Sequence, residues 1–120
     1  MLPYQVRTAA FAGAFLCSEC ALDDILVDIR TPQEWDETGV ASVPCMQLLL
    51  TWKVEYRDDA QPFIELLQPY VPSKETSLWF LCRAGTRSAM AARSMAIAGY
   101  IAVNDIRGGM EGDGATPGWI

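Results

Sequence analysis

The chain has 120 residues, of which 51% are hydrophobic and 20% charged, and its formal net charge at pH 7 is −6. This length favours a single domain over residues 1–120, and the apolar share is large enough to build a core. The negative charge disfavours binding to nucleic acid or to an anionic membrane, because both need a basic face on the protein.

Strand and helix patterns alternate along the first half of the chain. We expect a strand over 6–8, a helix over 9–20, a strand over 25–29, a helix over 32–37 and a strand over 45–50. Thr31 is placed to cap the second helix, which has Pro32 in its first turn, and Gly39 is placed to end it. Residues 51–59 are polar and predict no clear element.

The second half continues the alternation. We expect a helix over 60–70 before Pro72, a strand over 78–82, a helix over 86–98 with Gly99 as its stop, and a strand over 101–105; 112–118 is rich in breakers and predicts an irregular segment. The pattern predicts an α/β fold, a small parallel sheet with helices on both faces. In such sheets ligands bind beyond the carboxyl ends of the strands, which is where Cys82 lies.

The segment Cys82-Arg83-Ala84-Gly85-Thr86-Arg87 joins the predicted strand over 78–82 to the helix that follows. The amides of such a loop, the positive end of the helix and two guanidinium groups all favour an anion, so a thiolate is expected at Cys82. The chain contains no histidine, which excludes a cysteine–histidine pair and leaves loop amides, helix dipole and arginine to activate the thiol.

Loop length separates two chemistries that share this layout. Cysteine-dependent phosphatases use cysteine, five residues and then arginine, which binds phosphate oxygens together with the loop amides. Here Ser88 stands where that arginine would be, and Arg87 comes one position early. The smaller ring of amides predicts a site for a single terminal sulfur, a persulfide, and disfavours a phosphatase or an arsenate reductase.

Three motifs together resemble the rhodanese-type sulfurtransferases, whose active loop has six residues beginning with the catalytic cysteine. The loop at Cys82 is one. The second is Asp28-Ile29-Arg30-Thr31-Pro32-Gln33-Glu34-Trp35, similar to the family's Asp-x-Arg-x-Pro-x-Glu-aromatic signature, and the third is the pair Gly108-Gly109 after the last predicted strand. The resemblance covers residues 24–111 and implies a rhodanese-like fold.

The resemblance also implies a mechanism and a set of site residues. Cys82 would take sulfur from an anionic donor such as thiosulfate and pass it to a thiol, cyanide or protein acceptor, with no metal or organic cofactor. Arginine directly after the cysteine is similar to the thiosulfate type of loop. The donor-binding residues would be Arg83, Ala84, Gly85, Thr86, Arg87 and Ser88.

Other residues are weighed between function and structure. Asp28 and Arg30 are expected to form a buried pair behind the site. Glu34 lies either at the pocket mouth or on the exposed face of its helix. Arg87 either faces the pocket or turns outward to a carboxylate. Cys45 stands where the family usually has glycine, the family's usual histidine in the turn after Gly39 is missing, and Asp113 stands where an aromatic residue is common.

Two alternatives concern the cysteines and the role of the domain. The spacing Cys17-Ser18-Glu19-Cys20 fits half of a zinc site or a redox pair, and neither is favoured, because no strand precedes it and no histidine completes it. The four cysteines are expected to be reduced and the protein cytoplasmic, because a chain with this apolar share needs no disulfides and Cys82 lies in a catalytic-looking loop. The apolar stretch 8–17 is too short to cross a bilayer. The domain could instead be a persulfide carrier or a protein-interaction module.

Overall fold

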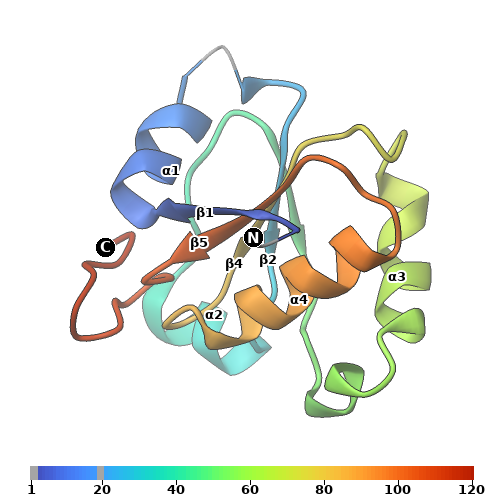
Figure 1. The fold of residues 1–120 in the computed structure, drawn as a ribbon. Helices are drawn as coiled ribbons and strands as arrows, with labels where there is room; N and C mark the ends of the chain where they lie inside the picture. Colours follow the sequence, from blue (N-terminus) through green and yellow to red (C-terminus); the bar gives the residue numbers. More distant parts are fainter. Residues whose placement is uncertain (1–2, 19–20) are drawn as a thin grey trace.

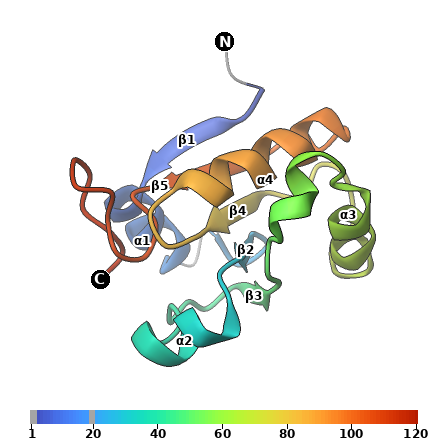
Figure 2. The ribbon, with the colours of Figure 1, turned by 90° about the horizontal axis from the view of Figure 1, so that it is seen from below.

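The computed structural model describes residues 3–18 and 21–120. Its centre is one sheet of five parallel strands in the order β1-β5-β4-β2-β3 (Figure 1). The strands are β1 (Gln5–Thr8), β2 (Ile25–Asp28), β3 (Met46–Leu49), β4 (Leu78–Leu81) and β5 (Val103–Arg107). Figure 2 shows this order from β1 at the top to β3 at the bottom. The predicted α/β fold with a small parallel sheet is confirmed.

Helices connect the strands, and several begin and end where the sequence predicts. They are α1 (Ala9–Leu16), α2 (Pro32–Thr38), η2 (Val54–Arg57), α3 (Gln61–Leu67), η3 (Gln68–Tyr70) and α4 (Thr86–Ile97). The cap of α2 is a full capping box, in which Thr31 and Glu34 bond each other's backbone amides, and Gly39 ends the helix as expected. The short 3-10 turn η2 lies in the stretch for which the sequence predicts no element.

The two faces of the sheet carry separate cores. Figure 1 shows α1 on one side and α3 and α4 on the other. On the α3 and α4 side, Phe63, Met95 and Phe80 are buried in one cluster, which also contains Cys82. On the α1 side, Leu16, Trp79 and other buried residues form the second cluster, which contains Cys45. Because β2 and β4 are buried along their whole lengths, their loops at the carboxyl edge are anchored on rigid elements.

Two predicted boundaries are wrong by several residues, for local reasons. The helix predicted over 9–20 ends at Leu16, because the Ser18 amide and hydroxyl both bond the Phe15 carbonyl and close the last turn; Cys20 lies outside the described residues. The last strand begins at Val103 and not at Ile101. The amides of Gly99 and Tyr100 bond carbonyls of the last turn of α4, so this stretch of chain ends the helix.

No helix in the part of the chain that the structure describes is long and apolar enough to cross a membrane.

Candidate active site

Cys82 follows β4 directly and is 1% exposed. Its sulfur accepts hydrogen bonds from the amide of Gly85, at 3.0 Å, and from the amide of Ser88, at 3.4 Å. Both amides belong to the start of α4, where helix amides have no partner within the helix and the dipole is positive. The loop therefore holds the sulfur in the setting that stabilises a thiolate or a terminal persulfide.

Two glycines allow the loop to close around the sulfur. Gly85 caps α4 with φ of 111°, a backbone conformation that residues with a side chain rarely adopt. Gly109, with φ of 60°, lies so close to the backbone of Cys82 and Arg83 that a Cβ atom there would collide with both carbonyls. The amides of Met110 and Glu111 bond those two carbonyls at 2.8 and 2.9 Å. The Gly-Gly turn after β5 thus fixes the shape of the loop.

Arg87 pairs with Glu34 of α2, the outward pairing with a carboxylate that the sequence analysis gives as one alternative. Its two terminal nitrogens donate to the two carboxylate oxygens at 2.8 and 2.9 Å. The hydrogen bond from Arg87 holds the pKa of Glu34 at about 2, well below the usual 4.5, against the opposing effect of burial. The hydrogen bond that Arg87 donates to Glu34, together with weaker attraction to Cys82 and Asp28, raises the pKa of Arg87. Glu34 therefore lies next to the loop, bound to Arg87.

Arg83 is also paired with a carboxylate. Its Nε lies 2.9 Å from a carboxylate oxygen of Glu111, and the arginine side chain is 63% exposed. Glu111 belongs to the segment after β5. Both guanidiniums of the loop are thus at least partly neutralised; the sequence analysis gives this as an alternative for Arg87 but does not predict it for Arg83. Ala84 is half-buried, and Thr86, the first residue of α4, is exposed.

Asp28 and Arg30 form the buried pair that the sequence predicts, with both side chains fully buried and a shortest contact of 2.8 Å. Arg30 also donates to the Thr38 hydroxyl and to the carbonyls of Glu34 and Gly39. The pair therefore orients α2. Because α2 carries Glu34, this orientation in turn places the carboxylate that holds Arg87.

Asp105 of β5 is a site residue that the sequence analysis missed. It is 6% exposed, and its carboxylate accepts a hydrogen bond of 2.6 Å from the hydroxyl of Ser88. Ser88 is fully buried, and its oxygen lies 3.4 Å from the sulfur of Cys82. The available signal was weak, because Asp105 is the last residue of the strand predicted over 101–105; in the structure it lies inside β5, where a buried charge needs a partner.

Cys45 and Cys17 lie apart from the loop. Cys45 is buried in the core on the α1 side of the sheet, and burial raises the pKa of its thiol. Cys17 is exposed, with its sulfur 3.7 Å from the carbonyl of Ser42. Within residues 3–18 and 21–120 the cysteine and acidic side chains form no group of three that could hold a metal ion.

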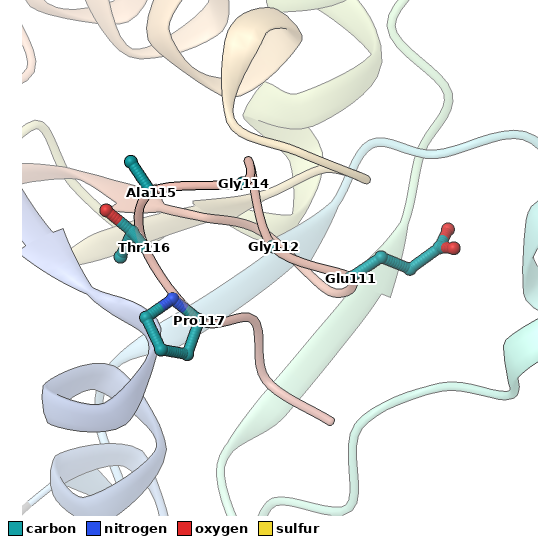
Figure 3. A pocket seen from close by; sticks show the side chains of 6 residues that line it. All are labelled: Glu111, Gly112, Gly114, Ala115, Thr116 and Pro117. Atoms are coloured by element: carbon teal, nitrogen blue, oxygen red, sulfur yellow. The ribbon is translucent and has the colours of Figure 1, made fainter.

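A shallow hollow lies in the C-terminal turn and not at Cys82. Figure 3 shows Thr116 and Pro117 on one side of this turn and the Glu111 side chain extending away from them. Glu111 is the only charged residue of the lining, and its carboxylate is bound to Arg83. The turn itself is closed by bonds from the Gly112 amide to Gly108 and from the Asp113 amide to Thr116. We therefore assign no ligand to this hollow.

Comparisons with known proteins agree with the motifs. A family model described as rhodanese-like domain matches residues 16–115. An uncharacterized protein of Rickettsia rickettsii is 30% identical over 113 residues, which cover 87% of this chain and 89% of that protein. A yeast protein of Lodderomyces elongisporus, the adenylyltransferase and sulfurtransferase UBA4, is 28% identical over 107 residues, 89% of this chain but 22% of its own length.

Among solved structures, a protein of Rhodopseudomonas palustris superposes with a TM-score of 0.62 at 29% identity, covering 97% of this chain and 79% of that one. It is described as a protein of unknown function and possible tyrosine phosphatase.

Proposed function

Because the chain belongs to the rhodanese-like domain family, we propose that it is a sulfurtransferase that carries sulfur as a persulfide on Cys82. The observation that supports this most is the pair of amides, from Gly85 and Ser88, directed at the Cys82 sulfur at the positive end of α4. Such donors stabilise negative charge on sulfur in both the thiolate and the persulfide state. The name of the UBA4 relative gives independent support, limited to the fifth of that protein that matches.

The proposed reaction has two displacement steps. The Cys82 thiolate attacks the outer sulfur of thiosulfate; a new S–S bond forms, the old one breaks, and sulfite leaves with its electron pair. An acceptor thiolate or cyanide then attacks the outer sulfur of the persulfide, and Cys82 leaves as a thiolate. No proton, electron or cofactor is needed from elsewhere. The partners proposed are thus a small anionic donor and a thiol, cyanide or protein acceptor.

Intact mass spectrometry tests the first step. After incubation with thiosulfate and removal of excess reagent, the wild type should gain the mass of one sulfur atom, and a thiol should remove it. Cys82→Ser should gain nothing and form no thiocyanate from thiosulfate and cyanide, since serine without a base is a weak nucleophile. Sulfur uptake by the serine variant would refute the assignment. Uptake that turns over with a protein acceptor but not with cyanide would identify a persulfide carrier.

Phosphate hydrolysis is a second candidate, because the Rhodopseudomonas palustris relative is described as a possible tyrosine phosphatase. Loop length argues against it here. The residue after Arg87 is Ser88, whose amide already bonds the sulfur, and the Arg87 guanidinium is bound to Glu34. An aryl phosphate assay decides: turnover at ordinary enzymatic rates that is lost in Cys82→Ser would favour the phosphatase.

A further inference from the structure

A chain of polar groups runs from Cys82 into the sheet. The sulfur lies 3.4 Å from the Ser88 hydroxyl oxygen, and that oxygen lies 2.6 Å from the Asp105 carboxylate. The three side chains are buried, with exposures of 1%, 0% and 6%. The three residues are shielded from most of the solvent, so a proton that leaves the thiol can pass directly to a neighbouring protein group.

Ser88 has one hydroxyl proton and three neighbours. The Gly85 carbonyl is 3.0 Å away, the Cys82 sulfur 3.4 Å and the Asp105 carboxylate 2.6 Å. The shortest contact involves a group that can be ionised, so it attracts the proton most strongly. The serine oxygen then presents a lone pair to the sulfur and can accept a proton from the thiol.

We propose that Asp105, acting through Ser88, accepts the proton of the Cys82 thiol, so that the thiolate forms without a histidine. The S–H bond breaks and a proton bonds to the serine oxygen, while the original hydroxyl proton bonds to the Asp105 carboxylate. The electron pair of the S–H bond stays on sulfur, and the total charge of the three groups does not change. This inference rests on the proposed role of Cys82 as the nucleophile.

The surroundings of Asp105 favour a proton on it. Burial raises the pKa of Asp105, and this effect exceeds the lowering by Ser88 and by Arg107. The residues in register on the neighbouring strands are Val6 of β1 and Phe80 of β4, which carry no charge. Arg107 is the charged group whose field reaches the carboxylate. Ser88 of α4 contacts the carboxylate, and Cys82, which follows β4, lies beyond Ser88. A carboxylate and a thiol that share one proton titrate as a pair.

After the sulfur has been passed on, the proton remains on Asp105. Cys82 leaves as a thiolate, and the Ser88 hydroxyl, freed from a protonated Asp105, can donate to it. Asp105 is thus a positioning residue, since it touches neither substrate nor sulfur, and Ser88 is the group in contact with the reacting atom.

The ultraviolet absorbance of the thiolate tests the relay without any sulfur donor. The signal is measured against pH for the wild type and for Cys82→Ser, and the difference isolates Cys82. A shared proton predicts two steps, one when the pair loses its first proton and one when it loses its second. A single step in the wild type overturns the proposal, whatever the variants do.

Variants identify the relay members. Asp105→Asn and Ser88→Ala should each give a single step, because the second titrating group, or the hydroxyl that links it to the thiol, is then missing. Ser94→Ala on the same helix, whose hydroxyl bonds Met90, and Asp58→Asn, whose side chain is 83% exposed, should keep the two steps. Two steps that persist in Asp105→Asn also overturn the proposal, because a group other than Asp105 would then share the proton.

The titration tests the relay, and sulfur uptake from thiosulfate tests the proposed function, so either can fail without the other. A protein with a two-step titration that takes up no sulfur from thiosulfate would refute sulfur transfer and retain the relay. A protein that takes up sulfur but titrates in one step would retain sulfur transfer and refute the relay.

Discussion

Glu34 and Arg87, which are 53 positions apart in the chain, hold each other by two hydrogen bonds of 2.8 and 2.9 Å. One belongs to the capping box of α2 and the other to the first turn of α4. The pair therefore joins two of the three motifs from which the family was inferred, and it sets the charge around Cys82.

Replacing Glu34 by Gln should lower the free energy of unfolding by an amount that depends on pH. Gln keeps the capping box, so the change isolates the charge. The pKa of Glu34 is about 2 in the folded protein, against a usual value of 4.5. The stability that its ionised carboxylate adds to the wild type is therefore fully present above about pH 4.5. It is lost as the pH falls from 4.5 towards 2. Urea unfolding across this range measures it; Glu37→Gln on the same helix is the control, and an equal difference at pH 2 and pH 7 would contradict the expectation.

Replacing Glu111 by Gln should release Arg83 towards an anionic donor. We expect kcat/KM for thiosulfate to rise by a few fold, mainly through KM, because an added cation attracts a dianion. Glu75→Gln changes the net charge equally at an exposed position away from the loop. If both variants show the same increase, the effect is one of overall charge and the Arg83–Glu111 pair does not control donor binding.

Replacing Asp28 by Asn should destabilise the fold strongly. The change leaves the fully buried Arg30 without its charged partner, and breaking such a pair costs about 3–5 kcal/mol. Thermal and urea unfolding give the value, with the exposed Asp36→Asn as reference. A loss below about 1 kcal/mol would mean that the other bonds of Arg30, to Thr38 and Gly39, suffice to hold it.

Replacing Gly109 by Ala should impair sulfur transfer more than folding. A Cβ atom there meets the carbonyls of Cys82 and Arg83, so the loop must shift, and a displacement of about 1 Å can cost on the order of a hundredfold in rate. Gly114→Ala is the matched control, since it has a similar positive φ but open space around it. Equal activity in the two variants would show that the close approach does not matter.

Replacing Cys45 by Ser should leave sulfur transfer nearly unchanged. Cys45 packs in the core on the α1 side, whereas Cys82 belongs to the core on the other side of the sheet. A lower melting temperature is expected, because a hydroxyl is then buried in an apolar cluster. Activity lost at full stability would instead make Cys45 a resolving thiol.

Local features were predictable and long-range pairings were not. The strand before Cys82, the helix after it and the cap at Thr31 follow from short stretches of sequence, because neighbouring residues decide them. The orientation of Arg83 and Arg87 depends on carboxylates brought close by the fold, namely Glu111 and Glu34. The contact between Ser88 and Asp105 likewise needs α4 to pack on β5. β5 begins later than predicted because the amides of Ala98, Gly99 and Tyr100 bond carbonyls of the last turn of α4, so these residues end the helix.

The hydrogen bonds from Met110 and Glu111 to the carbonyls of Cys82 and Arg83 also set an order of events during synthesis. Cys82 leaves the ribosome more than twenty-five residues before the segment that shapes its loop, counted from Cys82 to Gly109. Until Gly109 emerges, the nascent chain contains a cysteine whose surrounding loop is not yet fixed. A ribosome paused between these two positions would therefore present Cys82 in an unformed loop, and the loop takes its final shape only when β5 and its glycines dock.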